Sequence, residues 1–197
     1  SRQPGAAQVG IMVAASRMRH PLDARTLARL AARYAGEGPG TVVGFGLSND
    51  ERRGDTAEFE AAFALARKAG LMLAPHAGEL LGPEAVAETL NVLAPDRIGH
   101  GVRSVEDPPL VDRLAEAGVA LEVCPGSNVA LGVYDEDQDV PLRRLLDAGV
   151  RIALGADDPL IFGSRLVEQY AVARAVHGLA DGEPGVVQGL AHDRRRG

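Results

Sequence analysis

The 197-residue sequence predicts an α/β fold built on a parallel sheet. Six apolar runs of strand length alternate with six amphipathic segments that have the spacing of helices, and short loops join them. The runs are rich in Val, Leu and Ala, which is typical of strands that helices cover. The predicted strands are residues 9–15, 41–47, 71–75, 97–100, 119–124 and 150–155.

The helices between these strands are predicted from capping residues and from apolar side chains at helical spacing. Asp55 is predicted to cap the second helix, whose buried face includes Phe59 and Phe63. Proline directly follows Gly82 and Asp107, and proline is favoured in the first turn of a helix. The first predicted helix, residues 23–34, has an apolar stripe made of Leu27, Leu30, Ala31 and Tyr34, and the last two helices cover residues 140–148 and 164–176.

The sequence favours a barrel over an open, doubly wound sheet. An open sheet of that kind usually places a glycine-rich phosphate-binding turn after its first strand. Residues 14–17 read Ala-Ala-Ser-Arg at that position instead. We therefore expect a partial (β/α)8 barrel of the TIM type with six βα units. We also expect a single domain over residues 1–197, in which residues 9–177 carry the pattern and residues 178–197 form an irregular tail.

Composition and charge exclude several classes of function. The net charge of -6 argues against nucleic acid as a partner, because phosphate binding needs a basic face. The basic stretches 17–20 and 194–196 are short, and we interpret them as a solvated loop and a frayed tail. No apolar run approaches the roughly 20 residues of a membrane span. The single cysteine, Cys124, excludes a disulfide framework; we expect it to be buried and expect the protein in the cytoplasm.

Polar side chains follow three predicted strands at their carboxyl ends. His76 and Glu79 follow the third strand, His100 ends the fourth, and Asp157 and Asp158 follow the sixth. In a barrel of parallel strands these ends lie on the catalytic face. Two imidazoles and a carboxylate suit zinc or a similar divalent metal, which lowers the pKa of a bound water. A glutamate that burial keeps partly protonated can act beside it as a proton donor.

Each of these residues also has a purely structural explanation. A histidine that follows a strand is more often a hydrogen-bonded structural residue than a metal ligand. Asp157 or Asp158 can be a turn or N-cap residue before Pro159, and Glu79 can be solvated. The coincidence of all of them at strand ends favours a functional site.

Four short motifs contain these residues. They are His76-Ala77-Gly78-Glu79, Arg97-Ile98-Gly99-His100-Gly101, Glu122-Val123-Cys124-Pro125-Gly126-Ser127-Asn128 and Asp157-Asp158-Pro159-Leu160. In this order and spacing the sequence resembles the adenosine deaminase family of the amidohydrolase superfamily. That family includes adenosine, adenine and aminodeoxyfutalosine deaminases, and the resemblance covers about residues 9–177.

The resemblance implies a reaction and a role for each catalytic residue. His76 and Asp157 resemble zinc ligands. Glu79 resembles the acid that protonates a ring nitrogen of the purine, and His100 resembles the residue that orients and deprotonates the attacking water. The implied reaction is zinc-dependent, hydrolytic removal of the amine of an aminopurine nucleoside or base, with release of ammonia.

The same resemblance implies substrate contacts. Gly78 stands where the family brings backbone close to the base, and Asp158 stands where it contacts the imidazole side of the purine. Many family members have an Asp and a Gly in a loop that holds the base, where this sequence has Gly46 and Asn49. These departures leave the substrate open among adenosine, adenine and aminodeoxyfutalosine. They make plain adenosine the least favoured of the three.

One further departure concerns the first barrel strand, on which family members carry a His-x-His pair of zinc ligands. No such pair occurs in the sequence. We therefore expect the first two strands to be missing, the chain alone to be inactive, and its incomplete barrel to self-associate. Two alternatives are a catalytically dead remnant that acts as a folding or oligomerisation module, and a domain that binds a phosphorylated ligand. The second alternative would need a phosphate-binding turn that the sequence lacks.

Overall fold

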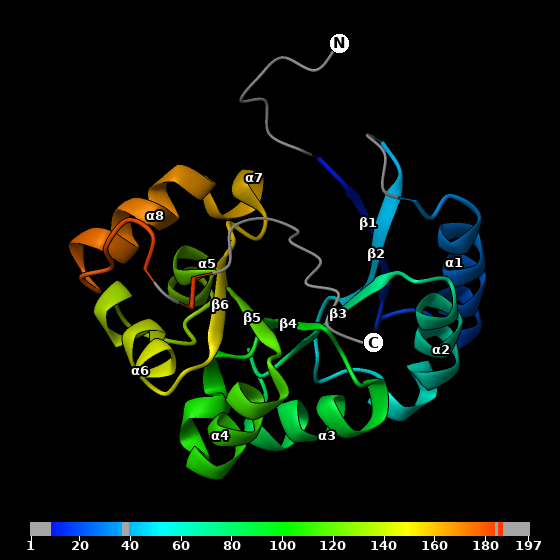
Figure 1. Cartoon of the computed structure of the whole chain (residues 1–197), viewed down its shortest axis with the longest axis horizontal. Helices are drawn as coiled ribbons and strands as arrows, with labels where there is room; N and C mark the ends of the chain where they lie inside the picture. The colour runs from blue at the N-terminus through cyan, green and yellow to red at the C-terminus, as the bar shows by residue number, and fades with distance from the viewer. Residues whose placement is uncertain (1–8, 37–39, 184, 187–197) are drawn as a thin grey trace.

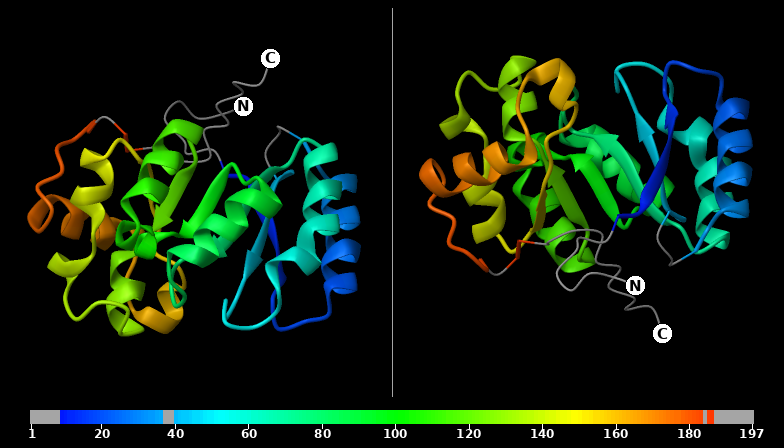
Figure 2. Two further views of the ribbon diagram at one scale, coloured as in Figure 1. Left: turned by 90° about the horizontal axis from the view of Figure 1, so that it is seen from below. Right: turned by 90° about the horizontal axis from the view of Figure 1, so that it is seen from above.

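The computed structural model describes residues 9–36, 40–183 and 185–186 (Figure 1). Each strand pairs in parallel with the next one along the chain, so the six predicted strands form a single sheet in sequence order. Helices α1 to α4, α6 and α8 surround this sheet on its outer side (Figures 1 and 2). The arrangement is that of a partial TIM barrel, as predicted. The strands are β1 (Ile11–Ser16), β2 (Val42–Ser48), β3 (Met72–Ala77), β4 (Arg97–His100), β5 (Ala120–Val123) and β6 (Arg151–Leu154).

The six predicted helices are present, together with further short helices that were not predicted. The predicted ones are α1 (Pro21–Arg33), α2 (Glu60–Lys68), α3 (Pro83–Leu93), α4 (Pro108–Ala117), α6 (Leu142–Asp147) and α8 (Leu166–Ala175). The 3-10 helix η1 (Thr56–Phe59) forms the start of the predicted second helix, before α2. The additional ones are α5 (Pro125–Ala130), α7 (Pro159–Phe162) and the 3-10 helices η2 (Val102–Glu106) and η3 (Asp137–Asp139). α7, η2 and η3 have only three to five residues, which are too few to show a helical period.

Strand β3 is longer than predicted and includes His76. The prediction ended this strand at residue 75, because proline lacks the N–H that a strand donates. In the structure β3 pairs with β2 through Pro75 and with β4 from His76 onward. The proline therefore lies where the ladder changes partner, and the strand continues past it.

The first helix buries small side chains. Helix α1 buries Ala24, Ala28 and Ala31, of which only Ala31 belongs to the predicted stripe. Leu30 and Tyr34 are exposed, so this part of the prediction is wrong. Alanines let a helix approach a sheet closely, and the larger side chains then remain at the margins of the contact.

Two clusters of buried side chains lie between the sheet and the outer helices. On β2 and β3, Phe45 and Leu73 pack with Phe63 of α2, and the rings of Phe45 and Phe63 meet edge to face with centroids 5.3 Å apart. The side chains of Ile98 and Leu121 belong to a second cluster, which α4 and α6 cover. Asp55 caps η1, directly before α2, by accepting a hydrogen bond from the Ala57 amide at 2.9 Å. Both the predicted cap and the predicted burial of Phe63 are confirmed.

The predicted irregular tail lies largely outside the described residues, which exclude 184 and 187–197. Within its described part, Val186 forms an isolated parallel bridge with Ile152 of β6.

Cys124 is buried, as predicted, and burial raises the pKa of its thiol. In the part of the chain that the structure describes, no helix is long and apolar enough to cross a membrane.

We predict that Phe63→Ala lowers the free energy of unfolding by roughly 3–5 kcal/mol, because truncation leaves a cavity beside Phe45. As the control, Leu160→Ala removes a side chain that is 97% exposed and should change stability by less than about 0.5 kcal/mol. Urea-induced unfolding followed by circular dichroism measures both. Equal losses for the two variants would contradict the burial of Phe63.

Candidate active site

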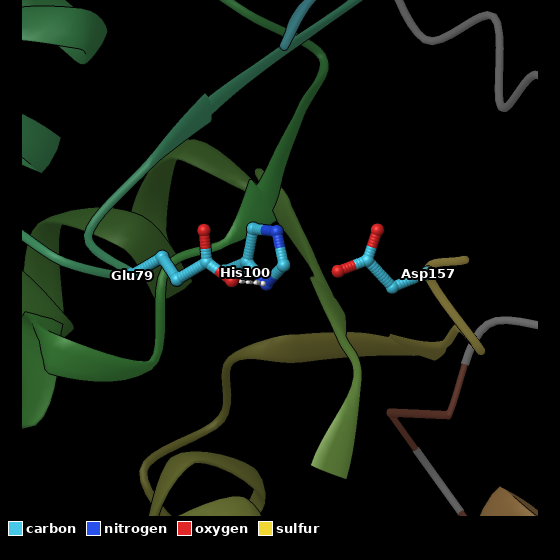
Figure 3. Close-up of side chains that lie close together, drawn as sticks. All are labelled: Glu79, His100 and Asp157. Carbon is cyan, nitrogen blue, oxygen red and sulfur yellow. Dashed lines mark ion pairs between the residues drawn. The ribbon is translucent and has the colours of Figure 1, made fainter. Parts of the chain in front are cut away.

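Loops after three parallel strands bring three of the predicted residues together. Glu79 follows β3, His100 ends β4 and Asp157 follows β6, and one ligand atom of each lies within 4.8 Å of the others. Their side chains point toward one another (Figure 3). Residues far apart in the sequence meet here because parallel strands end at the same rim of the sheet.

Glu79 and His100 face each other in a buried setting. The Glu79 Oε1 and His100 Nδ1 atoms are 3.4 Å apart, and the side chains are only 12% and 3% exposed. Neither atom has a hydrogen-bond partner among the described residues. Unsatisfied buried polar atoms are unfavourable and uncommon in folded proteins, so this pair is suited to a further partner such as a substrate, a water or a metal.

The protonation states of this pair follow from its surroundings. Burial, with smaller contributions from the carboxylates of Asp157 and Glu51, raises the pKa of Glu79 to about 7. Burial, with His76 nearby, lowers the pKa of His100 to about 3. At neutral pH the imidazole is therefore uncharged, and the 3.4 Å contact is not an ion pair. The glutamate is close to half protonated at the same pH.

His76 lies beside this cluster, but its ring nitrogens are not among the atoms that meet within 4.8 Å. Its ring packs edge-on against that of His100, with centroids 4.8 Å apart and planes at 82°. Burial lowers the pKa of His76, and the nearby carboxylate of Asp157 opposes that change. Across the strand pair, a Cβ at Gly99 would lie 2.4 Å from His76 Cδ2. Glycine at position 99 therefore provides the space that the His76 ring occupies.

Asp157 is held by a residue for which the sequence predicted no role. Its Oδ2 atom accepts a hydrogen bond of 2.6 Å from the hydroxyl of Ser127, which is buried in α5. Ser127 belongs to the motif after β5, so its position at a strand end was the available signal. The contact fixes one carboxylate oxygen of Asp157 beside the cluster.

Two predicted substrate contacts lie outside the cluster. The Asp158 carboxylate accepts hydrogen bonds from the amides of Leu160 and Ile161 at 3.1 and 3.3 Å, and so caps α7. Asn49 lies directly after β2, is exposed, and accepts a contact of 3.5 Å from the Ser48 hydroxyl. Asp158 therefore has the structural role that its sequence context also allowed.

Unusual backbone conformations concentrate at the predicted site. Four non-glycine residues among those described have positive φ angles. Three of them are Asn49 at +72°, His100 at +63° and Asp157 at +54°. Positive φ is uncommon for residues with a side chain, and strain of this kind clusters at functional sites.

The turn between β3 and α3 also carries predicted site residue Gly78. Its φ angle is +71°, and a Cβ there would lie 2.3 Å from Val86 Cγ2, so no other residue fits without rearrangement. The Gly78 amide donates a 2.7 Å hydrogen bond to Oε2 of Glu51. Glu51 is buried and was not identified from the sequence, although it lies three residues beyond the end of β2.

The prediction that residues 17–20 form a solvated loop is wrong for Arg17. This side chain is 4% exposed and donates hydrogen bonds to the carbonyl oxygen of His76 at 2.9 Å and to the Thr56 hydroxyl at 3.2 Å. Arg17 directly follows β1, so its side chain reaches across the rim instead of into solvent. Its position after a strand was again the signal.

The chemistry of these donors fits a zinc ion. Imidazole nitrogen and carboxylate oxygen are both common zinc ligands. His76, His100, Glu79 and Asp157 supply these groups within one small region, and His100 Nδ1 and Glu79 Oε1 have no hydrogen-bond partner in the described chain. The residues present are therefore compatible with a metal centre.

Known proteins are similar to this chain in both sequence and fold. A model of the family described as adenosine deaminase matches residues 1–188. A putative adenosine/adenine deaminase from Streptomyces coelicolor is 65% identical over 173 residues, which are 88% of this chain and 50% of that protein. An adenine deaminase from Agrobacterium fabrum is 46% identical over 169 residues, which are 86% of this chain and 46% of that protein.

Solved structures agree with these relationships. The crystal structure of an adenine deaminase from Arthrobacter aurescens superposes with a TM-score of 0.78 at 32% identity, covering 88% of this chain and 52% of that one. An amidohydrolase from Burkholderia ambifaria, crystallised with bound zinc, has the same fold with a TM-score of 0.76 at 23% identity, covering 89% and 48% of the two chains. The chain thus spans about half the length of the relatives it matches. On the strength of the family match and these identities, the chain belongs to the adenosine deaminase family.

Proposed function

We propose that this chain contributes the acid–base residues of a zinc-dependent enzyme that hydrolytically deaminates an aminopurine. The observation that carries the proposal is the convergence of Glu79, His100 and Asp157 in one cluster, within a member of the adenosine deaminase family. Water supplies the oxygen that replaces the amine, and the amine leaves as ammonia.

In this proposal each residue has a distinct task. His76 and Asp157 would hold the zinc, which when bound would lower the pKa of a water. His100 is uncharged at neutral pH, so a ring nitrogen can accept the proton of the attacking water. The Glu79 carboxyl holds a proton for part of the time near pH 7 and can donate it to a ring nitrogen of the purine.

The proposed substrate is adenine, with adenosine and aminodeoxyfutalosine as the alternatives to be tested beside it. Relatives at 46% identity and a solved structure at 32% identity are named adenine deaminases, which supports the free base. Gly78 lies next to Glu79 in the turn after β3, and so would bring backbone close to that base. Asn49 and Asp158 would bound the purine-binding site from the loops after β2 and β6.

The three candidate substrates can be ranked by measuring how fast the native protein releases ammonia from each of them. Activity on none of the three would refute the proposal.

We predict that Glu79→Gln, made in the native protein that carries this chain, lowers kcat by on the order of 10² to 10⁴-fold. The amide cannot donate the proton that the carboxyl holds. The zinc content should stay at the wild-type level, because Glu79 is proposed as a proton donor and not as a ligand. Ammonia release and metal analysis on the same sample measure both quantities.

Two further variants make that comparison specific. Asp157→Ala removes a proposed ligand and should lose zinc together with activity. Glu84→Gln makes the same chemical change on the exposed first turn of α3 and should leave turnover unchanged. Normal turnover in Glu79→Gln, or full zinc content in Asp157→Ala, would refute the roles proposed for these residues.

We also predict that the 197-residue chain by itself binds zinc weakly and releases little ammonia. Catalytic zinc sites usually take at least three protein ligands, and only His76 and Asp157 are proposed as ligands here. Strand β1 pairs with β2 alone among the described strands, and such an edge favours association of the isolated chain. Metal analysis, an ammonia assay and sedimentation of the purified chain test the three expectations. Stoichiometric zinc with normal turnover would contradict the two-ligand assignment.

A further inference from the structure

A buried carboxylate outside the proposed catalytic set binds four consecutive backbone amides. Glu51, in the loop after β2, is 5% exposed. Its Oε2 atom accepts from the Gly78 amide at 2.7 Å, and its Oε1 atom accepts from the Glu79 amide at 2.9 Å. Oε1 also accepts from the amides of Leu80 and Leu81. All four donors belong to the turn between β3 and α3.

Glu51 and this turn satisfy each other. A carboxylate is an acceptor with room for about four donors, and a buried one is unfavourable unless donors surround it. Consecutive amides that point to one side of a turn form a concave anion site of the kind called a nest. If the carboxylate were absent, four N–H groups of a partly buried turn would lose their acceptor within the protein, so the turn would rearrange.

The same turn is held from its other end by a cation. Arg17, after β1, donates to the carbonyl oxygen of His76 at 2.9 Å. Arg17 and Glu51 also interact electrostatically with each other. The loops after the first two strands therefore bind the backbone from His76 to Leu81, one through a carbonyl and the other through amides. Glu79 lies inside this segment, and its carboxyl group faces His100 at 3.4 Å.

We propose that Glu51 is a positioning residue, which places the Glu79 carboxyl by binding the amides of residues 78–81. It acts through the turn and touches no reacting atom. The inference rests on the proposed function for its effect on turnover, but the binding of the turn can be measured without any activity. A displacement of about 1 Å in a catalytic group can reduce turnover by on the order of 10²-fold, so this role is worth testing.

The first measurement is amide hydrogen exchange on the native protein that carries this chain. In Glu51→Gln one oxygen becomes an NH2 group, which cannot accept from the amides it faces. The amides of residues 78–81 should then exchange on the order of 10-fold faster or more, because each had a hydrogen bond to a charged acceptor. Glu51→Asp keeps the charge on a shorter stem and should retain part of the protection. Glu88→Gln, an exposed change on α3 that faces Arg17, is the matched control and should leave these amides unchanged.

The second measurement is turnover of the native protein, at a temperature at which circular dichroism shows every variant to be folded. Glu51→Gln should lower kcat by at least about 10-fold with little change in KM or zinc content, since the base and metal contacts remain. Glu51→Asp should recover part of that loss, and Glu88→Gln should match wild type.

The outcomes separate this inference from the proposed function. Unchanged exchange at residues 78–81 in Glu51→Gln overturns the inference, whatever the activity. Faster exchange with wild-type kcat overturns the positioning role, and shows that Glu51 only stabilises the turn. A wild-type native protein that deaminates none of the three aminopurines overturns the proposed function, and the effect of Glu51 on catalysis with it.

Discussion

Parallel pairing in chain order is the constraint on which the rest of the structure depends. Because every strand runs in the same direction, every loop that follows a strand emerges at one rim of the sheet. Arg17, Glu51, Glu79, His100 and Asp157 all lie in such positions, and all contribute to one region of the molecule. The helices pack on the outer face of the sheet through apolar side chains. The polar residues of the site lie at the rim, outside these apolar contacts.

The site combines strain with many fixed contacts. Positive φ angles at His100 and Asp157 are each unfavourable by about 1–3 kcal/mol, and they persist because the surroundings hold these residues on several sides. The Ser127 hydroxyl holds Asp157, strand pairing holds His100, and the Glu51 carboxylate holds the backbone of Glu79. The site is therefore held by contacts between loops, at the rim of a hydrogen-bonded sheet.

Sequence patterns predicted the elements that depend on local information. All six strands and six of the helices followed from apolar spacing, caps and prolines, and the strand-end rule located His76, Glu79, His100 and Asp157. The same patterns failed where a partner lies far along the chain: Glu51 lies 27 residues from Gly78, and nothing near it indicates that four amides will surround its carboxylate. Arg17 was misread for the same reason, since its acceptor at residue 76 lies 59 positions away. The roles of the predicted site residues stay predictions.

Two glycines show how demanding such a site is on residues that perform no chemistry. Position 99 has no room for a methyl group because the His76 ring fills that space, and position 78 combines a positive φ angle with the close approach of Val86. In a library of random single substitutions under selection for activity, every amino-acid substitution at these two positions should be depleted. The depletion should be as strong as at the proposed proton donor or at a proposed metal ligand. A map of mutational tolerance would then mark backbone positions as if they were catalytic, and only geometry would tell the two classes apart.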